Sequence, residues 1–250
     1  AEPGPFAESH IELLKTFADQ AVIAIENVRL FKELEARNKD LTVALEQQTA
    51  TSEILRVISS SQTDVQPVFD TIVRSVVRLC DGLFSALFQF DGELIRLVAQ
   101  HNFTPEALEA AHRGARPSRG LGSGRAILER AVVHIPDHEL DPEFQHQALT
   151  RVVGWRSGLY VPMLREGAPI GVIVVGRAEP GPFSDNEIEL LKTFADQGVI
   201  AIENVRLFKE LEARTGELTQ SVEKLTALGE VSRAVSSTLD VETVLDTIVS

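Results

Sequence analysis

Apolar and polar residues follow a helical period over two long stretches of the chain, and neither stretch contains a proline. They run from Ile11 to about Ser59 and from Ile188 to about Ser236. Apolar residues recur there about every 3.5 positions, which predicts long helices that pair as a parallel two-stranded coiled coil. We therefore expect a homodimer whose seam contains Phe31, Leu34, Asn38, Leu41, Phe208, Leu211, Leu218, Val222 and Leu225.

Polar residues on this apolar stripe fit the same interpretation. A buried asparagine, such as Asn38 or Asn204, costs stability but fixes the register and the number of helices in a coiled coil. The alternative is that Phe31 and Phe208 pack on their own domains instead of on a partner chain.

Between the long helices the pattern changes to short strands and short helices. Asp64 and Pro67 predict a helix start, Thr104 predicts another, and Asp91-Gly92 predicts a hairpin turn. The predicted helices are 64–80, 104–113, 125–130 and 144–153, and the predicted strands are 83–90, 94–99, 132–135, 158–164 and 170–175. This order predicts an α+β fold, in which an antiparallel sheet is flanked by helices and joined to long N- and C-terminal connector helices.

The beginning of the second long helix repeats the beginning of the first. Residues 2–37 and 179–214 are the same thirty-six-residue string and differ at five positions. In the second copy Ser184 and Glu187 have the spacing of a capping box, so we expect a well-defined helix start there. Ala7 replaces the serine in the first copy, which predicts a weaker start.

A second, weaker match between residues 54–73 and 231–249 keeps nearly the same interval. An interval of this length suits one globular domain plus a connector and predicts an array of whole domains. We expect residues 1–50 to be the last helix of a preceding domain plus a connector. Residues 51–210 would form a complete domain, and residues 211–250 a connector and the start of the next domain.

Composition narrows the classes of function. The net charge of −13 and the pI of about 4.9 disfavour nucleic acid and anionic membranes as partners. We find no apolar run long enough to span a membrane and no signal peptide, so we expect a cytoplasmic protein. The lone Cys80 excludes an intrachain disulfide and fits a reducing compartment.

Candidate chemistry gathers around a glycine-rich loop, Gly120–Gly124, which is followed by Arg125. Backbone N–H groups at such a helix start can bind an anion, although the loop can equally be a plain helix start beside a solvated basic segment. Arg156 is either a ligand contact or a partner in a structural ion pair. The residues that we expect to contact a ligand are Phe88, Ser123, Arg125, His134, Arg156, Ser157 and Tyr160.

Catalysis and metal binding find no support in the sequence. We identify no set of nucleophile, base and acid, and therefore predict no catalytic residue. Pro136 separates His134 from His138 and breaks the helical spacing that two metal ligands would need, so no metal site is predicted.

Residues from about 52 to 210 resemble a GAF domain, the small-molecule sensory module of bacterial signalling proteins and phosphodiesterases. The likeness rests on Asp91-Gly92, Gly120–Gly124, Val133–Asp137, Trp155–Met163, Pro169–Ile173 and Glu189–Gln197. The repeat also resembles multi-GAF sensor histidine kinases. This resemblance implies a module that binds a small molecule and signals through its connector helices to a downstream output domain in the same chain, a kinase or alternatively a nucleotide cyclase. A ligand-free spacer that only dimerises is the other interpretation.

Departures from the family patterns narrow the expected ligand. Members that bind a bilin covalently use a cysteine in a pocket helix, whereas Cys80 lies in another element and His146 follows Gln145. His146 as a haem ligand competes with an exposed helical histidine. The cyclic-nucleotide motif is not recognisable, and members that reduce methionine sulfoxide need several cysteines. We therefore expect an unidentified small molecule rather than a covalent bilin or haem.

Overall fold

The structure is a computed structural model that describes residues 7–145, 150 and 153–249. The chain divides into two compact units, Ala1–Ser52 and Glu53–Ser250. The first unit is formed by the helix α1 (Glu8–Ser60), which continues into the second unit. All described side chains of α1 from residue 8 to residue 46 are exposed.

The second unit is built on a five-stranded antiparallel sheet with the order β2-β1-β5-β4-β3. Its strands are β1 (Phe84–Phe90), β2 (Ile95–His101), β3 (Val133–Ile135), β4 (Ser157–Arg165) and β5 (Ala168–Arg177). Each lies within two residues of a predicted strand at either end. The predicted α+β class with an antiparallel sheet and long flanking helices is confirmed.

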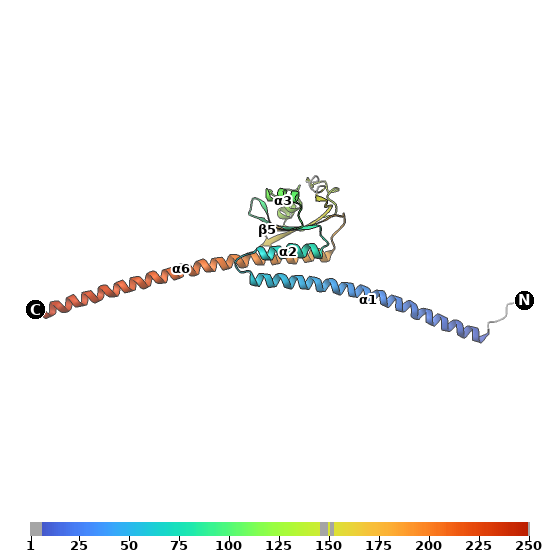
Figure 1. Cartoon of the computed structure of the whole chain (residues 1–250), viewed down its shortest axis with the longest axis horizontal. Coiled ribbons are helices and arrows are strands. Elements are labelled where there is room, and N and C mark those ends of the chain that lie inside the picture. The colour runs from blue at the N-terminus through green and yellow to red at the C-terminus, as the bar shows by residue number, and fades with distance from the viewer. Residues whose placement is uncertain (1–6, 146–149, 151–152, 250) are drawn as a thin grey trace. The chain divides into compact units, whose positions relative to one another are not determined.

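Helices cover both faces of this sheet. α2 (Gln66–Leu79) and α6 (Asp185–Val249) run side by side along one face, and α3 (Pro105–His112) lies on the other (Figure 1). α4 (Gly122–Glu129) packs on β3, β4 and β5 on the same side as α3. The face under α2 and α6 is a solid core that contains Phe69, Ile72, Leu159, Met163, Ile173, Leu191 and Phe194.

Short polar interactions fix several helix starts. Thr104 accepts a hydrogen bond from the Ala107 N–H at 3.3 Å. Ser184 and Glu187 form the predicted capping box, since the Ser184 N–H donates to the Glu187 carboxylate at 2.8 Å and the Glu187 N–H donates to the Ser184 hydroxyl at 3.4 Å. The cap expected at Asp64 is displaced by one residue, to Val65, and Asp64 instead accepts from the Gln66 N–H at 2.9 Å.

One predicted boundary is wrong. The sequence match places a helix break near Ser236, but α6 continues to Val249. In the first match segment Pro67 lies at the start of α2, and a proline there cannot continue a preceding helix because it has no N–H group. Thr243 occupies the equivalent position in the second segment, so this helix-breaking residue is missing. The predicted helix 144–153 falls partly on residues outside the described ones, and Phe144 itself is not helical.

Candidate ligand-binding site

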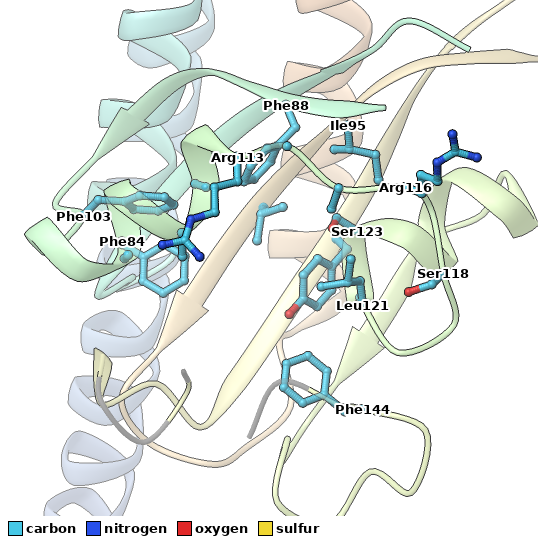
Figure 2. Close-up of a pocket in the computed structure, with 18 of the residues that line it drawn as sticks. Phe84, Phe88, Ile95, Phe103, Arg113, Arg116, Ser118, Leu121, Ser123 and Phe144 are labelled. Atoms are coloured by element: carbon cyan, nitrogen blue, oxygen red, sulfur yellow. The ribbon is translucent and has the colours of Figure 1, made fainter. Parts of the chain in front are cut away.

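A cavity of about 610 Å³ lies between the sheet and the elements that cover its α3 side (Figure 2). Its volume falls in the range of small-molecule sites. The described residues that line it are Phe84, Phe88, Ile95, Phe103, Ala107, Ala110, Ala111, Arg113, Gly114, Ala115, Arg116, Ser118, Leu121, Gly122, Ser123, Phe144, Trp155, Tyr160 and Val174.

Aromatic rings make up much of the wall. Phe84 and Phe103 lie on one side of the space, and Leu121, Ser123 and Phe144 lie on the other (Figure 2). The Phe84 ring packs edge to face on Phe103 and on Trp155, with centroids 5.1 Å apart in both pairs. Such contacts hold the rings in fixed orientations, so the wall is shaped before any ligand arrives.

The helix α4 begins directly at the cavity. A Cβ atom on Gly122 would come within 2.3 Å of Cε2 of Tyr160, so only glycine lets the first turn of α4 lie against this ring. Leu121 is the N-cap residue and offers no side-chain cap. The first N–H groups of α4 therefore lack a capping side chain, and a helix N-terminus of this kind favours an anion.

The charges along the described lining are all positive. Arg113 and Arg116 line the cavity, and no aspartate or glutamate is among the lining residues that the structure describes. Arg113 pairs with Glu109 at 3.0 Å and Arg116 pairs with Glu93 at 2.5 Å, but all four side chains are largely exposed to solvent. Ion pairs of this kind contribute little, so both guanidinium groups remain available to a ligand at the rim.

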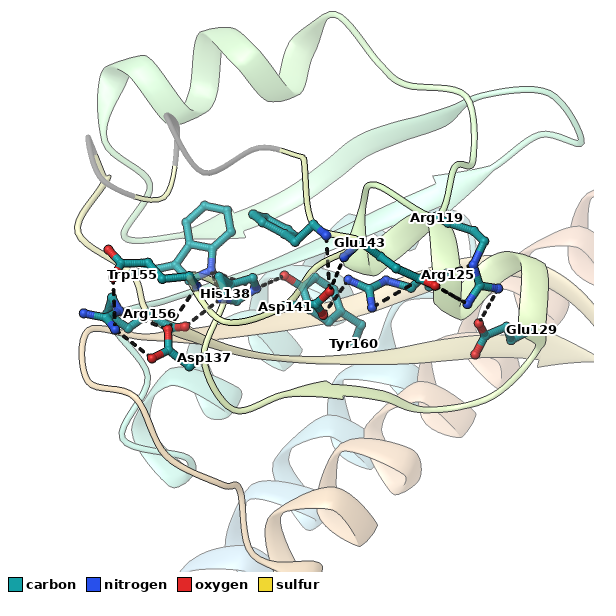
Figure 3. Close-up of polar contacts among 12 residues, drawn as sticks. Arg119, Arg125, Glu129, Asp137, His138, Asp141, Glu143, Trp155, Arg156 and Tyr160 are labelled. Carbon is teal, nitrogen blue, oxygen red and sulfur yellow. Dashed lines mark hydrogen bonds and ion pairs between the residues drawn. The ribbon is translucent and has the colours of Figure 1, made fainter.

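A buried network of polar contacts includes Trp155 and Tyr160, two residues of the cavity wall (Figure 3). The fully buried His138 has Nδ1 at 2.8 Å from the carbonyl oxygen of Arg156 and Nε2 at 2.8 Å from the hydroxyl of Tyr160. A carbonyl only accepts, so Nδ1 carries the proton and the Tyr160 hydroxyl donates to Nε2. Because Nδ1 already donates, the indole N–H of Trp155, 3.1 Å from Nδ1, cannot bond to that nitrogen, and Trp155 instead packs edge to face on the imidazole with ring centroids 5.4 Å apart.

Burial keeps His138 and Tyr160 uncharged. It lowers the pKa of His138 below its ordinary value and raises the pKa of Tyr160 above its ordinary value, so both side chains are neutral at pH 7. Two residues of the cavity wall, Trp155 and Tyr160, are thus held in place by one uncharged imidazole. The sequence did not predict this role for His138, because its partners come from β4 and the segment before it.

Three of the seven predicted site residues line the cavity and four do not. Phe88, Ser123 and Tyr160 line the cavity. Arg125 and His134 instead border a separate, more open depression beside α4 and β3.

Each of the four predicted residues outside the cavity has an intramolecular partner. Arg125 pairs with Asp141 at 2.8 Å, and both side chains are nearly buried. Arg156 pairs with Asp137 at 2.7 Å, the structural alternative considered above, and holds the pKa of Asp137 below its ordinary value. His134 Nε2 accepts from the Phe183 N–H at 3.0 Å, and Ser157 donates to the Glu179 carbonyl at 2.8 Å. Their proposed contacts with a ligand stay predictions.

Several lining residues were not among the predicted ones. α3 contributes Ala107, Ala110 and Ala111, whose small side chains leave the space open. The spacing of these alanines on one face of a predicted helix was a readable signal. Phe103 and Leu121 carried no such signal, because each lies in a loop.

An antiparallel sheet with a solid helical face and a hollow face defines an α+β domain with an internal cavity. Residues 62–203, more than half of the chain, match the profile of the GAF domain family. The chain therefore belongs to the GAF domain family, a family of sensory and regulatory modules.

Solved structures share this fold. The GAF domain of a phosphoenolpyruvate-protein phosphotransferase from Acinetobacter matches with 21% identity and a TM-score of 0.55, covering 66% of this chain and 97% of that one. The corresponding domain from Coxiella burnetii matches with 16% identity and a TM-score of 0.56, covering 66% and 96%. A free methionine-R-sulfoxide reductase from Neisseria meningitidis, in complex with its substrate, matches with 17% identity and a TM-score of 0.55, covering 66% and 93%.

The lone cysteine is not placed for thiol chemistry. Cys80 is fully buried at the end of α2, outside the cavity lining, and burial raises the pKa of its thiol to about 12. Within the described residues, no group of three or more His, Cys, Asp or Glu side chains could hold a metal ion. No helix among those same residues is long and apolar enough to cross a membrane.

Proposed function

We propose that this GAF domain binds a small molecule that has a flat apolar body and one carboxylate or phosphate group. The apolar body would lie among Phe84, Phe88 and Trp155, and the anionic group would lie at the start of α4, in a cavity that Arg113 also lines. The related methionine-R-sulfoxide reductase was solved with its substrate, which supports small-molecule binding by this fold.

The lack of carboxylates in the described lining carries the proposal. The chain has 37 acidic residues against 24 basic ones, yet the described cavity wall has arginines and no acidic side chain. A wall of this composition repels no anion. The helix start and the arginines would add favourable electrostatic contacts inside a largely apolar space.

Signal output would pass through β5 into α6. Val174 lines the cavity, and Arg177 ends the same strand three residues later. Arg177 forms an ion pair with Glu187 in the first turn of α6 and donates to the Cys80 carbonyl at the end of α2. A ligand that prefers one arrangement of this strand end would bias the position of α6, which is all that coupling requires.

The far part of α6 would carry the signal in a parallel homodimer. Three leucines of the predicted seam, Leu211, Leu218 and Leu225, are each more than 60% exposed, and a second copy of the helix would cover them. The repeat resembles sensor histidine kinases, so the proposed output is a kinase domain further along the parent chain. A nucleotide cyclase is the alternative output.

The single tryptophan offers a direct test of binding. Trp155 lines the cavity, so its fluorescence should change on addition of aromatic carboxylates or phosphates and stay constant with the matching amides or alcohols. Arg113→Gln should weaken binding about tenfold, the loss of one exposed charge-assisted hydrogen bond. Ala111→Leu should extend into the space and weaken binding. If a broad anionic library leaves the fluorescence unchanged, the ligand-free spacer becomes the better interpretation.

The dimer needs its own measurement. Light scattering of the 250-residue chain at micromolar concentration should give twice the chain mass of 27.4 kDa. Leu218→Asp and Leu225→Asp should give monomers, because a charge at a seam position cannot be buried against its twin. A monomeric wild-type chain would contradict the transmission part of the proposal and leave ligand binding untouched.

A further inference from the structure

The two copies of the repeated string have the same residues but different surroundings. In α6, Phe194 is fully buried and Val205 is 8% exposed. Phe17 and Val28 stand at the same places in α1, and both are 57% exposed. One copy of the string therefore covers something that the other copy lacks within the described residues.

The covered surface is the helical face of the sheet. The first part of α6 packs on β4 and β5 and lies beside α2. Gly198 of α6 marks the closest approach, since a Cβ atom there would lie 2.8 Å from Cε of Met163 and 3.7 Å from Cδ1 of Ile72. Burial on α6 ends near Val205, before Leu211, the first leucine of the predicted seam on this helix, which is 64% exposed.

We propose that α1 covers the equivalent sheet face of a further GAF domain, one that precedes it in the parent chain. The covering face consists of Leu13, Leu14, Phe17, Ala18, Ala21 and Val28, which correspond to α6 residues on its sheet-facing side. The letters Glu-Pro-Gly-Pro-Phe precede both copies, and in the second copy this segment joins β5 to α6. The same joint is therefore expected to connect α1 to a strand of its own sheet.

One difference on this face describes the missing partner. Ala21 stands where α6 has Gly198. The added methyl would press on the end of Met163 in the sheet present here. The sheet covered by α1 should therefore leave room for this methyl group at the position equivalent to Met163.

Peptide exchange on the 250-residue chain tests this surface. Phe194→Ala removes a buried ring and should weaken the seat of α6 on the order of 10²- to 10³-fold. Covalent attachment gives α6 an effective concentration of roughly 1 mM at the sheet, so a free peptide can compete with α6 only when the variant weakens the binding of α6 itself. A peptide of residues 7–37 at ~1 mM should then raise the melting temperature of this variant by several degrees. It should leave the wild-type chain unchanged.

Matched peptides sharpen the result. The peptide with Ala21→Gly should bind better than the natural 7–37 peptide, and Met163→Ala in the chain should remove that difference. The Phe17→Asp peptide should not bind. If the 184–214 peptide binds and neither 7–37 peptide does, the proposal is overturned.

If no peptide replaces α6 on the sheet, a variant of the whole chain tests the proposal instead. Gly198→Ala makes the sheet-facing residues of α6 the same as those of α1. The proposal expects this variant to stay folded, with a melting temperature within a few degrees of wild type. Loss of the folded second unit in Gly198→Ala that a second change, Met163→Ala, does not restore would show that the α1 face does not fit a GAF sheet.

Discussion

The two faces of the sheet carry similar apolar side chains but are covered differently. Along β5, Ile173 and Val175 belong to the packed face under α2 and α6, and Val172 and Val174 belong to the face with the cavity. All four are buried to 5% exposure or less. The strands themselves therefore do not decide which face is solid and which is hollow.

The covering elements decide it. The packed face lies under two long helices that contribute large side chains such as Phe69, Leu191 and Phe194. The hollow face lies under two eight-residue helices and loops, and α3 offers it three alanines. Protein interiors normally close such spaces, so a cavity kept open by small residues supports the proposed small-molecule site.

Removing one ring from each face should give the largest contrast. Phe69→Ala in the packed face should lower the free energy of unfolding by about 3–5 kcal/mol, because it creates a new buried void. Phe88→Ala should cost about 1–2 kcal/mol, because this half-buried ring already borders empty space. Urea unfolding followed by circular dichroism measures both losses. Equal losses would mean that the cavity is not open in solution.

The next effect concerns Arg177, which connects the end of β5 to the start of α6 and the end of α2. Arg177→Gln should cost about 3 kcal/mol, because it leaves the partly buried Glu187 and the Cys80 carbonyl without their cation. Arg165→Gln is the matched control, since its ion pair with Glu203 is more exposed and should contribute at most about 1 kcal/mol. Chemical denaturation of the two variants compares them. Similar losses would remove Arg177 from the proposed route to α6.

Local signals in the sequence predicted most of the fold. Asp91-Gly92 indicated the first hairpin and Ser184 with Glu187 indicated the start of α6, because each motif satisfies backbone groups within a few residues. The end of α6 was missed because Thr243 removes a stop signal without adding a visible replacement.

The site was harder to predict because it depends on contacts between distant residues. Phe88 and Tyr160 were correctly placed on strands, and the structure brings both to the cavity. Arg125 and Arg156 looked equally suitable, but each has a carboxylate partner 16 or 19 residues away in the chain. No periodicity within one element reports which charges will meet in the folded state.

Lower pH should weaken the wall of the hollow face before it affects the packed face. Burial lowers the pKa of His138, and the nearby Asp141 and Asp137 raise it less than burial lowers it. The unfolded chain therefore binds a proton below about pH 6.5 that the folded chain does not. Stability should be full above that pH and should fall as the pH drops toward the folded pKa.

Two measurements check this sign. Urea midpoints from pH 8 to pH 5 should decrease, and the decrease should be smaller in His138→Gln. The half-buried His134 contributes in the same direction, because partial burial lowers its pKa as well, so some slope should remain in the variant. In NMR titrations the ring protons of His138 should not shift near pH 6.5. A normal titration there would contradict the neutral hydrogen bond from Tyr160.

Adding volume to each face should give the smallest change in stability and a clear functional contrast. Ala111→Leu extends into the cavity, so the free energy of unfolding should change by less than about 1 kcal/mol. Ala195→Leu adds the same atoms to the packed face, where Ala195 is 2% exposed, and should cost about 1–3 kcal/mol through overpacking. Thermal unfolding with and without an anionic ligand separates the effects, because Ala111→Leu should lose much of the ligand-induced stabilisation and Ala195→Leu should keep it. A ligand that stabilises Ala111→Leu as strongly as the wild type binds outside this part of the cavity, and the hollow face would then need another explanation.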